Sequence, residues 1–235
     1  MTPHDASDGT PVSRRERPAK PALTREGIVT AAVGILRAEG MRKLTMRRVA
    51  QELDTGAASL YVYVRNTAEL QAAVLDELLG TVELRPKKGD WRERLEKVLL
   101  SYTSVLFAYP GLAQSALVAR PSGKHYFALV ETLLALLEEG GVPAGQAAWG
   151  VDLLLQMPTA TAAEHAAEDA ATQEEWDALI RVVRTASRRT HPHIAGLADE
   201  LLSGTPEAHM SWGLQVLING IAHTPRPTDD KPELD

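Results

Sequence analysis

Cysteine is absent from this 235-residue chain, and its absence excludes disulfides, thiolate metal sites and cysteine nucleophiles. Long apolar runs are absent too. No stretch reaches the roughly 18 residues that a membrane-spanning helix needs, so no membrane contact is expected. Residues 1–20 also lack the apolar segment of a secretory signal. The sequence therefore predicts a soluble, cytoplasmic protein.

The usual signatures of catalytic and cofactor sites are missing as well. There is no P-loop, no G-x-S-x-G nucleophile elbow, no H-E-x-x-H zinc motif and no G-x-G-x-x-G after a strand. His165 lies among acidic residues, but the surrounding Ala/Glu-rich stretch is typical of an exposed helix rather than of a metal site. We therefore predict no catalytic residue, no metal ligand and no cofactor, and we do not expect an enzyme.

Charge is divided unevenly along the chain, whose formal net charge is −6. Residues 1–67 hold eleven Lys and Arg against seven Asp and Glu, a balance of +4. Residues 68–235 hold fourteen against twenty-four, a balance of −10. A basic head on an acidic body is the asymmetry expected if only the head meets the phosphates of a nucleic acid.

One stretch near the N-terminus carries the most specific pattern. Thr45 is a predicted N-cap, and the apolar residues of 46–53 recur at i, i+3, i+4 and i+7. Residues 54–56, Asp-Thr-Gly, break this helix, and a second short helix follows with Leu60 and Val64 on its buried side. Two short helices separated by a tight turn indicate a helix-turn-helix.

Apolar residues at helical spacing continue through the rest of the chain, so the predicted fold class is all-α. The segment at 125–139 is apolar nearly all round and is predicted to form the buried centre of the larger domain. Further N-caps are predicted at Thr24, Asn66, Asp90 and Thr205. The predicted helices are 25–40, 46–53, 57–64, 66–80, 91–109, 112–119, 125–139, 144–169, 173–189, 194–202 and 206–222.

These segments divide the chain into four parts. Residues 1–22 are predicted to form a disordered basic N-terminal arm, 23–80 the helix-turn-helix domain, 81–223 a larger helical domain, and 224–235 a disordered tail. Three Arg and a Lys lie near the end of the arm. The arm is either a solvated tail or a segment that reaches phosphates or the minor groove beside the head.

The head carries LTMRRVAQEL at residues 44–53 and SLYVYVRNTAEL at residues 59–70, and this arrangement resembles the DNA-binding domain of the tetracycline-repressor (TetR) family. In that family an "LT-x-R-x-[VL]A-x-x-L" helix supports a recognition helix carrying "LY-x-[YH][VF]", and an "EL" pair opens the next helix. One departure is Asp54, where a glycine is usual, and Asp tolerates a left-handed backbone better than most residues. The matching residues are Leu44, Thr45, Arg47, Val49, Ala50, Leu53, Leu60, Tyr61, Tyr63, Val64, Asn66, Glu69 and Leu70.

The resemblance implies a ligand-responsive transcriptional regulator. Its partners would be double-stranded operator DNA and a small-molecule effector that releases a repressor from a palindromic site. The larger domain would bind the effector and form a homodimer through the helices near 144–169 and 206–222. The C-terminal part of the chain is also similar, more loosely, to the regulatory domain of tetracycline repressors themselves.

DNA contact needs cations and hydroxyl groups on phosphates, and side chains that reach base edges. Tyr61 and Tyr63 leave the recognition helix on its outer side, whereas residues 56–58 carry little or no side chain. The tyrosines and Arg47, helped by groove shape, are therefore expected to contribute more than Gly56, Ala57 and Ala58. The predicted DNA-binding residues are Lys43, Thr45, Arg47, Arg48, Thr55, Ala57, Ala58, Ser59, Tyr61, Tyr63 and Thr67.

The effector site implied by the resemblance lies between the helices at 91–109, 125–139 and 144–168. Polar and aromatic side chains of these helices are the candidates to line it. The predicted ligand-binding residues are Tyr102, His125, Tyr126, Trp149, Gln156, Thr159 and His165.

Two other classes of function stay open at the level of sequence. A helical small-molecule enzyme would need paired carboxylates or a His–carboxylate dyad on compatible helix faces, and no convincing pair is found. An interaction module with a vestigial helix-turn-helix is compatible with the small side chains of residues 56–58.

Overall fold

A computed structural model of the chain describes residues 22–118, 121–168 and 173–227. Within these ranges the regular structure is entirely helical, as the sequence predicts. None of the described helices is both long and apolar enough to cross a membrane. Residues 1–21 of the N-terminal arm and residues 228–235 of the tail lie outside the described part.

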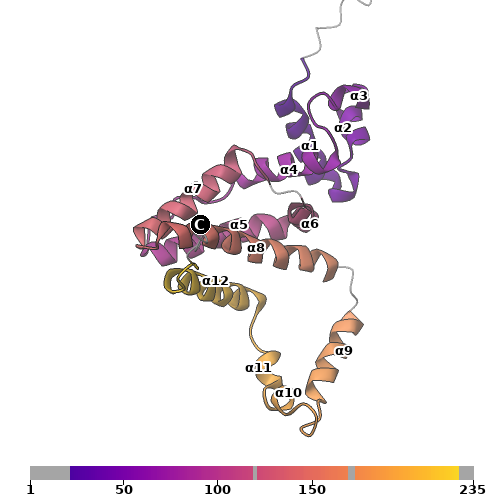
Figure 1. The fold of residues 1–235 in the computed structure, drawn as a ribbon. Coiled ribbons are helices and arrows are strands. Elements are labelled where there is room, and N and C mark those ends of the chain that lie inside the picture. Colours follow the sequence, from indigo (N-terminus) through magenta and orange to yellow (C-terminus); the bar gives the residue numbers. More distant parts are fainter. Residues whose placement is uncertain (1–21, 119–120, 169–172, 228–235) are drawn as a thin grey trace, which may run out of the picture.

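The head consists of α1 (Arg25–Glu39), a 3₁₀ turn η2 (Met41–Lys43), α2 (Met46–Glu52) and α3 (Ala57–Leu60) (Figure 1). The hydroxyl oxygens of Thr24 and Thr45 accept backbone N–H groups at the starts of α1 and α2, which confirms both predicted N-caps. Gly40 ends α1 at φ 81°, a backbone conformation that glycine adopts at little cost.

The turn of the helix-turn-helix forms despite the departure from the family pattern. Asp54 has φ 46° and is the single non-glycine residue with positive φ in the described chain. Leu60 and Val64 are fully buried, as predicted. The second helix is shorter than expected, because α3 ends at Leu60 and residues 61–63 continue as a turn.

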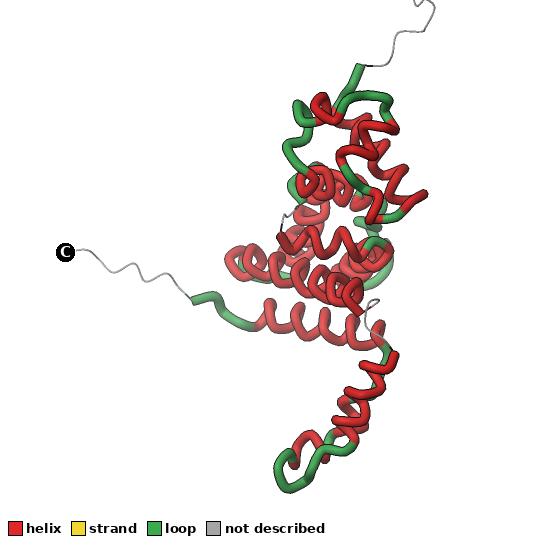
Figure 2. Tube along the Cα trace, turned by 90° about the vertical axis from the view of Figure 1, so that its right-hand side faces the viewer, coloured by secondary structure: helices red, strands yellow, loops and turns green. Residues whose placement is uncertain are grey.

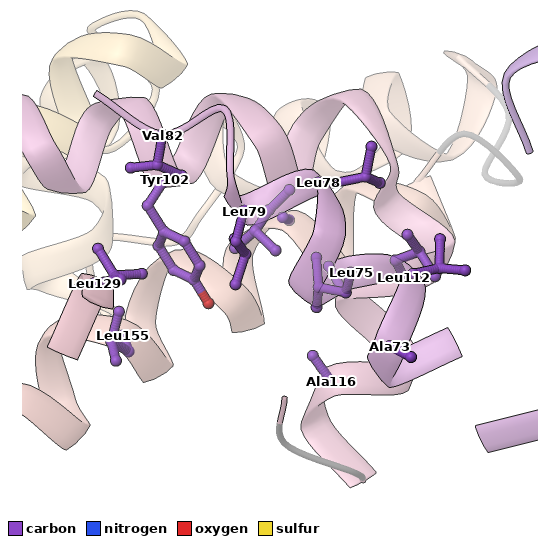
Figure 3. Packing of buried hydrophobic residues seen from close by; sticks show 14 of the residues in the cluster. Ala73, Leu75, Leu78, Leu79, Val82, Tyr102, Leu112, Ala116, Leu129 and Leu155 are labelled. Atoms are coloured by element: carbon purple, nitrogen blue, oxygen red, sulfur yellow. The ribbon is translucent and has the colours of Figure 1, made fainter. Parts of the chain in front are cut away.

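Helix α4 (Thr67–Leu79) joins the head to the body. It packs against α1 on one side and against α6 and α7 on the other. Its apolar side chains meet those of α5, α6 and α7 in one continuous core, where Leu75, Leu79 and Leu129 are almost completely buried (Figure 3). Each such leucine contributes about 1.5–3 kcal/mol relative to an exposed position, so head and body share part of their stability.

The body contains α5 (Trp91–Ala108), α6 (Pro110–Val118), α7 (Lys124–Glu139), α8 (Ala144–Glu168) and α12 (Pro206–His223). Helix α8 contacts all four of the others and is therefore the centre of the domain. The prediction that 125–139 forms the buried centre is wrong. On α7 Leu129, Leu133, Leu136 and Leu137 are buried, but Phe127 on the opposite face is 61% exposed.

Three other predicted boundaries also differ. Pro110 ends α5 as expected but also begins α6, because proline fits the first turn of a helix, where its missing N–H is not needed. The predicted helix 173–189 ends at Arg184. The predicted helix 194–202 is two short helices, α10 (Pro192–Gly196) and α11 (Ala198–Leu201).

Helices α9 (Gln173–Arg184), α10 and α11 form a projection that extends away from the body, at the end of the molecule opposite the head (Figures 1 and 2). Several of its apolar side chains are exposed, among them Leu179, Val182 and Leu201. The body of the same chain therefore leaves much of the apolar surface of this projection uncovered.

Candidate functional site

The outer end of the head presents aromatic side chains to solvent. Val62 is 80% exposed, Tyr61 52% and Tyr63 37%. Large apolar side chains at such exposure on a small basic domain are typical of a contact surface. Both tyrosines lie in the turn that directly follows α3, and both side chains are accessible from solvent.

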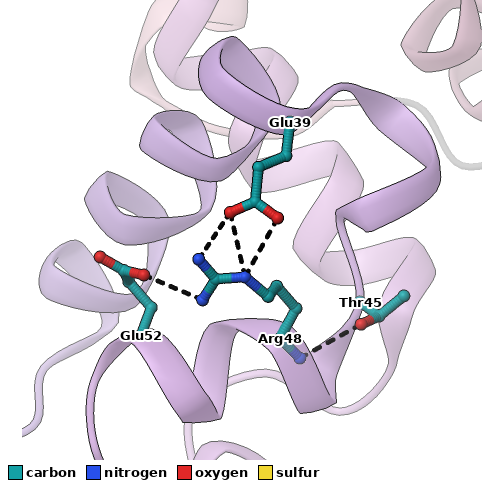
Figure 4. Close-up of polar contacts among 4 residues, drawn as sticks. All are labelled: Glu39, Thr45, Arg48 and Glu52. Atoms are coloured by element: carbon teal, nitrogen blue, oxygen red, sulfur yellow. Dashed lines mark hydrogen bonds and ion pairs between the residues drawn. The ribbon is translucent and has the colours of Figure 1, made fainter.

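Arg47 and Arg48 are adjacent in α2 but have different surroundings. Arg47 is exposed and forms no ion pair with any residue of the described chain. Arg48 is half-buried, and its guanidinium binds Glu39 of α1 and Glu52 of α2, with Nη1 2.9 Å from a Glu52 carboxylate oxygen (Figure 4).

The ion pairs of Arg48 change the protonation chemistry of the head. The hydrogen bond from Arg48 lowers the pKa of Glu39, and the bonds to Glu39 and Glu52 raise the pKa of Arg48. Arg48 therefore joins α1 to α2 in the absence of DNA, and its charge is already neutralised by two carboxylates. The structure thus offers Arg47, rather than Arg48, as the free cation of α2.

The remaining predicted DNA-binding residues lie in the head and at the start of α4. Thr45 uses its hydroxyl oxygen to accept the Arg48 N–H at 3.2 Å, and Thr67 is exposed in the first turn of α4. Of the small residues, Ala58 and Ser59 are exposed and Thr55 and Ala57 are half-buried, whereas Lys43 is exposed in η2.

Four of the predicted ligand-binding residues meet at one cavity in the body. Tyr102 of α5, Tyr126 of α7, and Gln156 and Thr159 of α8 line a space of about 70 Å³. The Tyr102 hydroxyl lies 2.7 Å from the Thr159 hydroxyl oxygen. Burial raises the pKa of Tyr102 to about 12, and the hydrogen bond to Thr159 partly opposes this rise. Tyr102 therefore stays a neutral hydrogen-bonding group at any physiological pH.

Three other predicted ligand-binding residues are not at this cavity. His125 lies at the contact between α7 and α4, with Nε2 3.9 Å from a carboxylate oxygen of Glu77. Trp149 faces outward from α8 into a groove beside α12, where the Arg226 guanidinium lies 4.9 Å from its ring centroid. The side chain of His165 lies outside the described part of the structure.

The cavity also includes residues that the sequence reasoning missed. They are Ala116 and Leu117 of α6, Pro121 between α6 and α7, and Asp152 and Leu155 of α8. One signal was present for Asp152, because Asp152, Gln156 and Thr159 recur at i, i+4 and i+7 and form a polar stripe on an otherwise apolar helix. No comparable signal marked α6, whose contribution depends on how it packs against α8.

Two family models match the chain. The model of the bacterial regulatory proteins of the tetR family matches residues 28–74, and the tetracyclin repressor-like C-terminal domain matches residues 85–224. The second match alone spans more than half of the chain. The chain belongs to the TetR family. It is therefore a ligand-responsive, DNA-binding transcriptional regulator.

Solved and curated relatives agree with this assignment. A Streptomyces transcription regulator, SCO7704, is 56% identical, with a TM-score of 0.78 over 89% of this chain and 99% of that one. ActR of Streptomyces coelicolor, solved in complex with actinorhodin, is 35% identical, with a TM-score of 0.74 over 86% of this chain and 96% of that one. The transcriptional repressor DrrR1 of Streptomyces coeruleorubidus is 28% identical over 88% of this chain and 80% of its own length. These relatives are transcriptional regulators, not enzymes.

Proposed function

We propose that this TetR-family chain represses transcription as a homodimer, with one head in each of two successive major grooves of a palindromic operator. The observation that carries this proposal is the surface of the head, on which Arg47, Tyr61 and Tyr63 are all exposed and Arg47 forms no ion pair within the described chain. Cations and hydroxyl donors of this kind set register on the phosphates. Base readout is left to the tyrosine rings, the small residues around Ala58 and the shape of the groove.

Exposed apolar side chains on two helices of the body support the homodimer. Trp149 and Leu153 of α8 and Trp212 and Val216 of α12 are each about half-exposed or more, with Trp212 at 69%. The two helices pack on each other and line a groove of about 390 Å³ together with Gly150 and Gly220. A contiguous apolar patch of this kind marks an interface, and a twofold axis would place the same patch of a second copy against it.

The effector site in this proposal is the cavity between Tyr102, Tyr126 and Thr159. At about 70 Å³ it is far smaller than the roughly 300–1,000 Å³ of ordinary ligand sites, so an effector has to displace its lining. A ligand that binds only the displaced arrangement shifts the chain toward that arrangement. Because ActR has been solved with actinorhodin, actinorhodin is a rational first probe for this cavity.

The DNA-binding part of the proposal is tested with full-length protein and duplexes selected from a random pool. Wild type should bind a selected palindrome with an affinity that falls steeply as salt rises. Arg47→Ala should weaken binding and reduce the slope of log K against log salt by about 0.9 for each phosphate that the variant no longer neutralises.

Arg181→Ala is the matched control. It removes the same charge from an exposed position on α9, at the opposite end of the molecule (Figure 1), and should leave the slope unchanged. A folded protein that selects no duplex at low salt would contradict the proposed function. Equal slopes for Arg47→Ala and wild type would remove Arg47 from the interface.

A further inference from the structure

A carboxylate is enclosed at the junction between head and body. Asp76 of α4 is 8% exposed and lies among the buried leucines and valine of that helix. Its Oδ1 accepts the backbone N–H of Tyr126 at 2.9 Å. Burying a carboxylate is costly unless it is hydrogen-bonded, and the first N–H groups of a helix have no partner inside the helix. Asp76 therefore caps α7 from a different helix.

The start of α7 is built to receive this carboxylate. Gly123 occupies the N-cap position of α7, and no side chain of α7 itself caps the helix. A Cβ atom added to Gly123 would lie 2.1 Å from Asp76 Oδ2. The φ of Gly123 is −90°, which any residue adopts, so glycine is required here for space rather than for backbone freedom. The absence of a side chain at Gly123 therefore leaves the space that the Asp76 carboxylate occupies.

The capped residue also forms part of the cavity. Tyr126 lines it together with Tyr102 and Thr159, while its N–H is held by Asp76. On the α6 side of the cavity, the Ser115 hydroxyl donates to the Gln71 side-chain oxygen of α4 at 2.9 Å, next to the lining residues Ala116 and Leu117. The α6 and α7 walls of the cavity are therefore each tied to the helix that joins the head to the body.

We propose that Asp76 is the positioning residue that couples the cavity to the DNA-binding head. The inference rests on the proposed function, in which the cavity is the effector site. Filling so small a cavity displaces Tyr126, and the hydrogen bond to Asp76 transmits that displacement to α4, which packs on α1 of the head. Because coupling between two sites is reciprocal, DNA bound to the head must change the stability of the cavity walls.

Reciprocity allows a test that needs no effector. Full-length protein is mixed with a duplex that wild type selects from a random pool, and hydrogen exchange is followed in peptides covering residues 123–130 and 152–159. Exchange by local opening reports the opening free energy. Duplex should change exchange in wild type by about fivefold or more, the lower end of typical allosteric coupling. In Asp76→Ala the duplex should still bind, but the change should fall below about twofold.

Asp90→Ala provides the matched control. Asp90 Oδ1 caps α5 by accepting the Glu93 N–H at 3.0 Å, but Asp90 lies next to the helix that it caps and does not link it to α4. This variant loses a cap of the same chemistry, so it should lose similar stability and keep the full duplex-dependent change. Asp76→Asn should keep most of the change as well, because its side-chain oxygen can still accept the Tyr126 N–H.

Gly123→Ala provides a second route to the same answer. Its added methyl group displaces the Asp76 carboxylate without removing it, so it should abolish the coupling even if Asp76→Ala fails to fold. A duplex-dependent change of wild-type size in folded Asp76→Ala or Gly123→Ala would overturn the inference. Failure of wild type to select any duplex would instead refute the proposed function, so the two failures are distinguishable.

Discussion

The Tyr102–Thr159 hydrogen bond yields a prediction in which two single substitutions have unequal effects. The Thr159 hydroxyl donates to the Leu155 carbonyl oxygen at 2.7 Å, which uses its single proton. The Tyr102 hydroxyl must therefore be the donor in the 2.7 Å contact between the two side chains. Tyr102 is 3% exposed and Thr159 is 6% exposed, so water does not readily replace either partner.

Because Tyr102 is the donor, the two substitutions should lower the free energy of unfolding by different amounts. Tyr102→Phe removes the donor to the Thr159 hydroxyl oxygen, but Thr159 keeps its own hydrogen bond to Leu155. The variant should therefore lose about 1 kcal/mol of unfolding free energy, the usual net value of a hydrogen bond. Thr159→Val leaves the buried Tyr102 hydroxyl without its acceptor and should cost more, up to about 3 kcal/mol. The double variant should cost less than the sum of the two by about 1–2 kcal/mol, because neither polar group is then left unpaired.

Urea unfolding followed by circular dichroism measures these differences, at one fixed protein concentration because association shifts the apparent stability. Thr103→Val is the control. Thr103 is equally buried and donates to the Leu99 carbonyl oxygen at 2.7 Å, but none of the hydrogen bonds of the described chain uses it as an acceptor. Thr103→Val should therefore lower the free energy of unfolding by less than Thr159→Val does. Two results would refute the assignment of Tyr102 as the donor: additive losses of unfolding free energy in the double variant, or a larger loss for Tyr102→Phe than for Thr159→Val.

Three further predictions follow from the same structure. Because burial raises the pKa of Tyr102 from 10.0 to about 12, the unfolded chain loses this proton at lower pH than the folded one. The folded state should therefore lose about 2–3 kcal/mol of stability relative to the unfolded chain as the pH rises from 10 toward 12, and none of this loss should occur below pH 10. The difference between wild type and Tyr102→Phe in urea unfolding should show that loss, and a constant difference would contradict it. Val216→Arg should place an unpaired cation in the proposed dimer interface and shift the light-scattering mass to that of one 25.5 kDa chain, whereas Phe127→Arg on α7 should leave the mass of the proposed dimer unchanged. Arg48→Ala should lower the melting temperature through loss of its two ion pairs, yet it should reduce the salt slope of DNA binding less than Arg47→Ala.

Local signals were sufficient for much of the helical layout. The N-caps at Thr24, Thr45, Asn66, Asp90 and Thr205 each accept the N–H of the third residue beyond them, as the sequence predicts. An N-cap depends on residues within one turn of the helix, so residues that are close in the sequence determine it. The cap at Asn66 uses only the Asn66 side chain, because the Glu69 carboxylate accepts the N–H of Arg65.

Contacts between distant residues explain where the sequence reasoning fell short. From the sequence Arg48 cannot be told from a surface cation, but in the structure it forms an ion pair with Glu39 of α1. Trp149 is predicted to line the effector site, but in the structure it faces outward from α8 into the groove beside α12. Helix α7 is apolar on most of its surface, yet the sequence does not state which faces its neighbours cover. In each case the helix is predictable, and the partner of its surface is not.

The sequence by itself determined the all-α class, the helix-turn-helix with its left-handed Asp54, and the confinement of net positive charge to the N-terminal part of the chain. These depend on spacing, backbone preference and composition, which are properties of neighbouring residues. Only the tertiary structure decided that Tyr102, Tyr126 and Thr159 meet at one cavity, and that Asp76 of α4 caps α7. The physical reason is that such contacts join residues from different helices, and their geometry is fixed only when the helices pack.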